Sequence, residues 1–431
     1  MRSYLLRGAT ALAGCVFVLT VTAWADPPKD KSQGGGGKIP ATGKADPDLA
    51  SFDRILPQIL RENDVPGVAA AVAKDGKIVY SRGFGYSDLE KKEPVEPDAL
   101  FRIASISKPI TAVAVIQLVE RGKLGLEDKV FDVLGLKAPE GAKVKFDERW
   151  KNVTILHLLQ HRGGWDRDKS FDPLFRSPII VKELKIEPPA DADDIVHYML
   201  RHRLDFDPGD HYAYSNFGYT LLGRVIEKVT GGKYEDYVKK EVLAPLGIEH
   251  MRQGKTLLAD RAPGEVKYYC GGEGDAVMGP NLGKSVPWPY GGWCLESMDS
   301  HGAWISSAGD LVRFAAAFND PDKCKILKAE SIKTMFARPP GKAGEDAEGQ
   351  PRAAYYGCGW SVRTVHDGKL NTWHTGSLDG TSTLLVRRWD GLTWAVLFNS
   401  REENMGHTPS DVADALMHEA ANAVEHWPGG E

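Results

Sequence analysis

The chain has 431 residues, of which 42% are hydrophobic and 26% are charged, and its formal net charge is -5. This balance is typical of a globular protein with a sizeable core, and the scattered lysines and arginines exclude a basic surface for nucleic acid. We therefore expect one large domain or two interleaved ones, without a nucleic-acid partner.

The first 25 residues have the pattern of a signal peptide. Two arginines precede an apolar run over residues 9–21, and A-W-A at 23–25 is typical of a cleavage site. The run is too short for a comfortable membrane span. Alternatively, L-A-G-C at 12–15 resembles a lipoprotein signal and would leave Cys15 as a lipid anchor. Both interpretations predict export to the periplasm or the extracellular side.

Residues 26–46 are rich in glycine, proline and lysine and have no hydrophobic period. They are expected to form a disordered linker, followed by a catalytic domain over residues 47–428. The domain begins with a helix near residue 49, since five apolar residues recur on one helical face. These residues are Phe52, Ile55, Leu56, Ile59 and Leu60.

Segments 68–73 and 78–84 flank an Asp75-Gly76 turn, a pattern that predicts a β-hairpin. Next comes a helix over about 105–121 whose interior is apolar almost all round, so we expect it to be buried on every side.

The middle of the chain, about 126–300, is expected to be a mostly helical insertion. Helical patterns cover 155–160, 193–201, 214–230, 234–246 and, beyond the insertion, 308–318. A long loop over 262–302 carries Trp288, Tyr290 and Trp293, which favours a role for this loop in lining a pocket.

The last part of the chain returns to strands. Hairpins are predicted for 361–365 with 370–374 and for 383–388 with 392–398, before an amphipathic helix over 410–424. Strands at both ends of the chain predict an α/β fold. Its antiparallel sheet is built from both chain ends and flanked by helices, with the helical insertion packed beside it.

Four cysteines follow the predicted signal peptide, and an exported protein can form disulfides. We favour Cys270–Cys294 and Cys324–Cys358 because these pairs close local loops, while the other pairings and four unpaired thiols stay open. Zinc is disfavoured because no C-x-x-C spacing occurs.

Ser105 and Lys108 form an S-x-x-K pattern at the start of the buried helix. Residues three apart lie on the same helical face, so the lysine can be the base that activates the serine hydroxyl. Backbone N–H groups at the helix start would stabilise an oxyanion.

Tyr214-Ser215-Asn216 gives a second pattern, Y-x-N. Tyr214 could pass a proton to a leaving group, and Asn216 could hold Lys108 and donate to a substrate carbonyl. The alternative is a helix cap, for which Ser215 or Asn216 is well suited.

His374-Thr375-Gly376 is followed by Ser377 near a predicted strand end. We expect Gly376 to let substrate approach the strand edge and the Ser377 N–H to be a second oxyanion donor.

The three patterns, in this order, resemble those of the serine β-lactamase and penicillin-binding protein family. Flanking segments support the resemblance: F-R-I-A before Ser105, H-L-L-Q-H-R-G-G at 157–164 and I-S-S-A-G-D-L at 305–311. The resemblance implies a sheet domain and a helical domain with the site between them. It also implies an acyl-enzyme mechanism on amide or ester carbonyls, with neither metal nor cofactor.

The sequence departs from the family pattern at His374, where the usual residue is lysine. The resemblance therefore favours a D-alanyl-D-alanine carboxypeptidase or an esterase. A β-lactamase and a penicillin-binding sensor that is acylated without turnover remain the alternatives. His157 and His161 have the spacing of a helical zinc pair, but no third ligand is evident and we favour a structural role.

Overall fold

The structure is a computed structural model that describes residues 38–139, 145–402 and 404–428. The predicted signal peptide, Cys15 and residues 26–37 of the expected linker lie outside this range. Ala41–Thr42, within the expected linker, form strand β1, which pairs with β3. The sheet thus extends into that segment.

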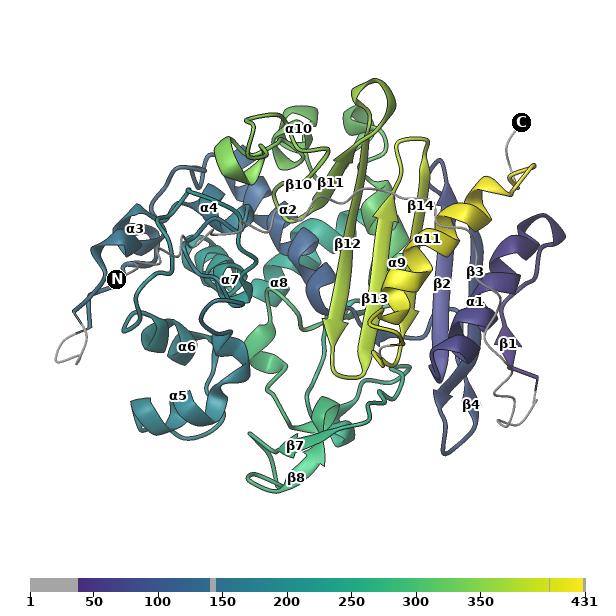
Figure 1. The fold of residues 1–431 in the computed structure, drawn as a ribbon, viewed down its shortest axis with the longest axis horizontal. Helices are drawn as coiled ribbons and strands as arrows, with labels where there is room; N and C mark the ends of the chain where they lie inside the picture. Colours follow the sequence, from purple (N-terminus) through teal and green to yellow (C-terminus); the bar gives the residue numbers. More distant parts are fainter. Residues whose placement is uncertain (1–37, 140–144, 403, 429–431) are drawn as a thin grey trace, which may run out of the picture. The chain divides into compact units, whose positions relative to one another are not determined.

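The described residues contain a nine-stranded sheet with the order β1-β3-β2-β14-β13-β12-β11-β10, and β4 pairs with β3 (Figure 1). All its pairs are antiparallel, and β14 joins β2, so the two ends of the chain meet at its centre. This confirms the predicted fold class. The strands are β2 (Gly67–Lys74), β3 (Lys77–Asp88), β4 (Glu93–Pro94), β10 (Ala354–Tyr356), β11 (Ser361–Thr364), β12 (Leu370–Leu378), β13 (Thr381–Arg387) and β14 (Leu392–Phe398).

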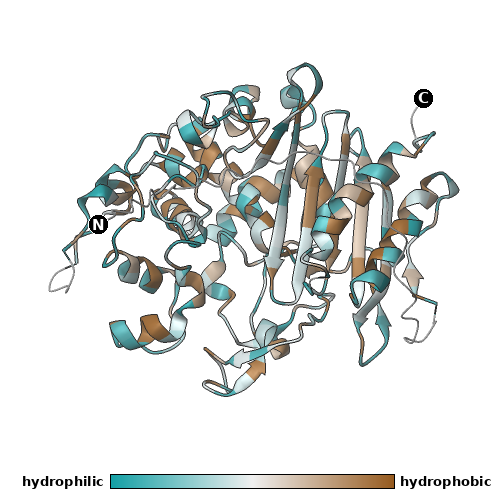
Figure 2. Cartoon of the chain, in the orientation of Figure 1, coloured by the Kyte–Doolittle hydropathy of each residue, from teal (hydrophilic) through white to brown (hydrophobic). Residues whose placement is uncertain are grey.

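Helices cover both faces of the sheet. Helices α1 (Ala50–Glu62) and α11 (Pro409–Asn422) pack on one face, and α9 (Ala308–Ala316) packs on the other. Side chains alternate along β2, so Val68, Ala70 and Val72 belong to the core that contains α1, while Ala69, Ala71 and Ala73 belong to the larger core on the other face. Figure 2 shows hydrophobic and hydrophilic residues on both α1 and α11, as expected for helices with one buried face.

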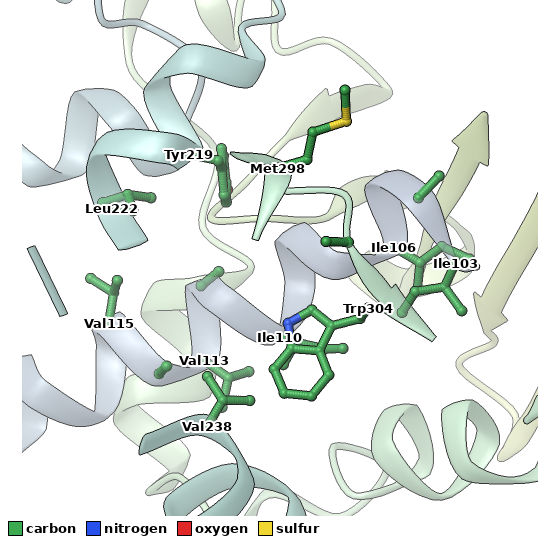
Figure 3. Packing of buried hydrophobic residues seen from close by; sticks show 14 of the residues in the cluster. Ile103, Ile106, Ile110, Val113, Val115, Tyr219, Leu222, Val238, Met298 and Trp304 are labelled. Atoms are coloured by element: carbon green, nitrogen blue, oxygen red, sulfur yellow. The ribbon is translucent and has the colours of Figure 1, made fainter. Parts of the chain in front are cut away.

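Helix α2 (Ser107–Glu120) runs through the larger core, and its residues from Ser107 to Leu118 are all buried. Figure 3 shows its apolar side chains packed among Tyr219, Leu222, Val238 and Trp304. The prediction that this helix is buried on every side is confirmed. Its rigid packing fixes Lys108 in its first turn and Ser105 in the short turn just before it.

The middle of the chain is helical but consists of shorter helices than the pattern predicts. No helix was predicted at α3, α5 or α10, and Tyr214 lies just outside α7 because Ser215 caps that helix. No helix among the described residues is both long and apolar enough to span a membrane. The helices are α3 (Val130–Leu134), α4 (Ile155–Leu159), α5 (Ser177–Leu184), α6 (Ala192–Met199), α7 (Asn216–Thr230), α8 (Tyr234–Val238) and α10 (Ala329–Met335). The remaining short strands are β5 (Phe101–Arg102), β6 (Arg252–Gln253), β7 (Glu273–Asp275), β8 (Ser285–Pro287) and β9 (Trp304–Ser306).

The predicted disulfides are wrong, because all four cysteines of the described chain are free thiols. Cys358 is fully buried in the core, while Cys270 is partly exposed and donates to the Gly272 carbonyl at 3.2 Å. Cys294 lies 3.8 Å from a carboxylate oxygen of Glu296. Each thiol packs against its own neighbours, so a short loop along the sequence does not bring its two thiols together.

Candidate active site

Ser105 lies in a single 3-10 turn, Ala104–Ile106, between β5 and α2. Strand β5 pairs with β9, which holds this turn from one side. Ala104 has φ +47°, in the left-handed region that non-glycine residues rarely adopt. Ser105 is partly exposed while its neighbours in the turn are buried. The backbone therefore presents this hydroxyl to solvent.

Lys108 is fully buried, with its Nζ 3.0 Å from Ser105 Oγ. The same Nζ donates to Asn216 Oδ1 at 2.8 Å and to the His301 carbonyl at 3.1 Å. Burial, followed by the nearby Arg167 charge, lowers the pKa of Lys108 well below its ordinary value. A neutral amine has two hydrogens, which the two carbonyl oxygens accept, so its lone pair faces the Ser105 hydroxyl.

The cap of α7 positions Tyr214 and Asn216. Ser215 Oγ accepts from the Gly218 N–H at 3.3 Å, so the predicted cap and the predicted site coexist in one tripeptide. Asn216 holds Lys108, as expected, and its Nδ2 also donates to Asp172 at 2.6 Å. Burial raises the pKa of Asp172.

Tyr214 lines the same cavity as Ser105, and Ser105 lowers the pKa of its phenol. Its ring has Lys108 Nζ 4.8 Å from the ring centroid, the Arg167 guanidinium 4.5 Å away and the His161 ring at 4.3 Å between centroids. Burial raises the pKa of Tyr214 and outweighs the opposing effect of Ser105. The phenol is therefore neutral at rest, with a proton to give.

The third pattern lies inside β12 rather than at a strand end. His374 is buried, with Nδ1 2.6 Å from the Thr375 carbonyl and Nε2 3.0 Å from the Tyr356 hydroxyl. Because a carbonyl only accepts, Nδ1 carries the proton and Nε2 accepts from Tyr356. Burial lowers the pKa of His374 to about 3, so this position carries no positive charge near neutral pH.

Gly376 does not face substrate as predicted. A Cβ built there would lie 2.2 Å from the Ile103 carbonyl oxygen and 2.2 Å from Thr383 Oγ1. The glycine thus lets β12 pack against the segment that leads to Ser105. Thr375 and Ser377, which alternate with it, are exposed.

A cavity of about 460 Å³ connects these groups. All three sequence patterns contribute to its wall, so the structure brings the predicted site residues together. The predicted residues that line it are Ser105, Tyr214, Asn216, His374, Thr375 and Ser377. Others that sequence analysis missed are Arg167, Phe175, Tyr212, Tyr356, Asp379 and Arg401. No local pattern marks these residues, because they reach the cavity from separate loops and strands.

The loop over 262–302 lines the cavity, as predicted, but through Met298, His301 and Gly302 at its end rather than through its aromatic residues. Trp293 is buried, with its indole 5.3 Å from the Arg102 guanidinium and its Nε1 donating to Asp379 at 3.3 Å. Tyr290 lies 5.7 Å from the same guanidinium. These two aromatic residues therefore pack against Arg102, which lies three residues before Ser105 in the chain.

His157 and His161 are not a helical pair, since α4 ends at Leu159 and His161 has φ +54°. His157 accepts from the Thr154 N–H, while His161 Nδ1 accepts from the Ser215 N–H at 3.2 Å. Across the described ranges, no group of three or more potential side-chain ligands could hold a metal ion.

Comparisons with known proteins agree with this geometry. Penicillin-binding protein 4* of Bacillus subtilis (strain 168) is 28% identical in an alignment of 357 residues that covers 77% of this chain and 67% of that protein. Protein flp of Staphylococcus aureus (strain NCTC 8325 / PS 47) is 27% identical over 336 residues, covering 78% and 59%. The chain thus spans about three fifths to two thirds of the length of these relatives.

Among solved structures, the penicillin-binding protein homologue from Pyrococcus abyssi has a TM-score of 0.65 at 25% identity, covering 88% of this chain and 79% of that one. The D-amino acid amidase from Ochrobactrum anthropi SV3 has a TM-score of 0.64 at 22% identity, covering 88% and 99%. EstCE1, a hydrolase with promiscuous acyltransferase activity, has a TM-score of 0.63 at 20% identity, covering 86% and 98%. These last two show the fold alone. Residues 52–418 match the family model described as Beta-lactamase, and the chain therefore belongs to the β-lactamase family of serine hydrolases.

Proposed function

We propose that this protein hydrolyses amide or ester bonds through an acyl-enzyme on Ser105, as a D-alanyl-D-alanine carboxypeptidase-like or esterase-like enzyme. The observation that carries the proposal is the buried Lys108 amine, 3.0 Å from Ser105 Oγ with two carbonyl oxygens accepting its hydrogens. This arrangement supplies a neutral base with its lone pair toward the nucleophile.

In the first half-reaction Ser105 Oγ attacks the substrate carbonyl and its proton passes to Lys108. Tyr214 gives its proton to the leaving amine or alcohol and regains one from Lys108. The backbone N–H groups of Ser105 and Ser377 hold the oxyanion, and removal of one such donor typically costs about 10²–10³ in rate. Water then releases the acyl group by the same proton route in reverse.

The neutral His374 favours peptide or ester substrates over β-lactams. With its pKa lowered to about 3, it offers no charge to a β-lactam carboxylate, which disfavours efficient antibiotic hydrolysis. The names of similar proteins, a D-amino acid amidase and a hydrolase with acyltransferase activity, agree with amide or ester substrates.

Mass spectrometry after incubation with a penicillin, a D-Ala-D-Ala peptide and a nitrophenyl ester tests the proposal. We expect peptide or ester turnover that leaves no stable adduct, and no turnover by Ser105→Ala at unchanged melting temperature. A stable acyl group on Ser105 without product release would instead identify a penicillin-binding sensor, and rapid penicillin hydrolysis a β-lactamase. Unchanged hydrolysis by Ser105→Ala would refute the assignment of the nucleophile.

We also propose export, supported by the arginines, the apolar run and the cleavage pattern within residues 1–25. Expression of the full chain, followed by fractionation and N-terminal sequencing, tests this. A mature chain starting at Asp26 is expected; a lipid-modified Cys15 would indicate an anchored form, and an unprocessed cytoplasmic chain would contradict export.

A further inference from the structure

Arg167 lines the active-site cavity but has no part in the mechanism so far described. It is exposed and lies in the loop after α4, with its guanidinium 4.5 Å from the centroid of the Tyr214 ring. The ion pair recorded for it is with Asp168, at 3.7 Å, and that carboxylate is 87% exposed. Solvent therefore screens this pair, and the Arg167 charge remains available to the cavity.

The other basic groups of the cavity cannot supply that charge. Arg401 is paired with Asp379 at 2.5 Å, while burial lowers the pKa of His374 to about 3 and the pKa of Lys108 well below its ordinary value. Among the described lining residues, Arg167 is thus the permanent cation without a carboxylate in hydrogen-bonding distance. It is also the one placed over the phenol that carries a proton in the proposed reaction.

We propose that Arg167 is a positioning residue that acts through Tyr214, by stabilising the phenolate formed when this tyrosine gives its proton to the leaving group. The inference rests on the proposed function. The proton balance is closed: Ser105 gives its proton to Lys108, Tyr214 gives one to the leaving group, and Lys108 returns one to Tyr214. The bond from Ser105 Oγ to the acyl carbon forms as the bond to the leaving group breaks.

The surroundings of Tyr214 and Lys108 make this cation necessary. Burial disfavours a phenolate, and among the nearby groups the neighbouring Tyr212 and the carboxyl of Asp172 disfavour it further. Arg167 has the opposite effect on Tyr214, and it also lowers the pKa of Lys108, which Asp172 raises. The titratable or charged groups that face the pair are His161, Asp172, Tyr212, Tyr219, His301, Tyr356 and His374.

Leaving-group chemistry provides the test. A nitrophenolate leaves as a stable anion without a proton, whereas an amine must be protonated as it departs. Arg167→Gln, Arg167→Lys and the wild type are compared on a nitrophenyl ester and on a D-amino-acid amide, with kcat/KM measured across pH. Lys169→Gln is the matched control, because Lys169 is an exposed cation of the same loop that bonds the Asp205 carbonyl and does not line the cavity.

For Arg167→Gln we expect kcat/KM on the amide to fall about tenfold, equivalent to about 1.4 kcal/mol, with a loss below about threefold on the nitrophenyl ester. The acid limb of both profiles moves to higher pH, because without the Arg167 charge Lys108 binds its proton more readily. Arg167→Lys restores most of the amide rate, and Lys169→Gln behaves as wild type.

The inference is overturned if Arg167→Gln loses kcat/KM equally on both substrates. It is also overturned if the acid limb does not move and Arg167→Lys does not restore the amide rate. Either result would assign Arg167 a structural role. Wild-type rates on both substrates for Arg167→Gln would also overturn the inference, while the proposed function would stand. If the wild type hydrolyses neither substrate and a fluorophosphonate does not label Ser105, the proposed function fails and the inference fails with it.

Discussion

Replacing Gly376 by alanine tests whether β12 fixes the position of the nucleophile. The new Cβ would lie 2.2 Å from the Ile103 carbonyl oxygen, and real Cβ atoms essentially never come within 3.0 Å of such an atom. Strand β12 and the segment that leads to Ser105 must then separate by about 0.8 Å. Ile103 lies two residues before Ser105, so the hydroxyl moves with it. A misplacement of about 1 Å can cost roughly 10² in rate.

We therefore expect Gly376→Ala to lower kcat/KM about 10²-fold, a loss of about 2.7 kcal/mol in transition-state stabilisation. Overpacking also lowers the free energy of unfolding by about 1–3 kcal/mol. Ester hydrolysis and urea unfolding measure the two effects. Gly232→Ala is the control, since a Cβ at that position meets no atom within 4 Å. A Gly376→Ala variant with wild-type kcat/KM would refute the reasoning that this contact positions Ser105.

Three further predictions concern other parts of the molecule. Lys108→Met lowers kcat by about 10²–10⁴; in the wild type, kcat/KM falls as the pH drops through the lowered pKa of Lys108, because protonation removes the base. Arg102→Lys lowers the free energy of unfolding, measured in urea, by about 2–4 kcal/mol. The Arg102 guanidinium donates to the Pro289 and Lys255 carbonyls and lies beside the buried Glu265, and one ammonium cannot replace all of these contacts. In denaturant, protein starting at residue 26 gives four reactive thiols with or without prior reduction, and a lower count without reduction would contradict the free cysteines.

The fold followed from local patterns wherever one short segment determines its own geometry. Asp75-Gly76 marked a real hairpin turn, the hairpin predicted for 383–388 with 392–398 formed as β13 and β14, and the five apolar residues of α1 are the ones that the helix buries. A single sheet built from both ends of the chain could be predicted because each end showed a hairpin pattern of its own. Such patterns depend on residues only a few positions apart, which is why they can be detected in one sequence.

Contacts between distant segments were harder to predict. The partner of Asn216 is Asp172, 44 residues earlier, and the cation above Tyr214 is Arg167. No spacing rule links these residues, since loops that lack a repeating pattern bring them to the cavity. The disulfide prediction failed for the same reason, because loop length along the chain does not set the distance between two thiols in space.

The third pattern shows how one missed turn changes the assignment of roles. The strand was expected to end at His374, yet β12 continues to Leu378, where Asp379-Gly380 joins it to β13. Within a continuous strand, side chains alternate between faces, so His374 and Gly376 point into the protein while Thr375 and Ser377 are exposed. A register shifted by one residue would bury those two hydroxyls and expose the histidine. The position of this turn therefore decides that two exposed hydroxyl groups line the cavity on this strand beside a buried, uncharged imidazole.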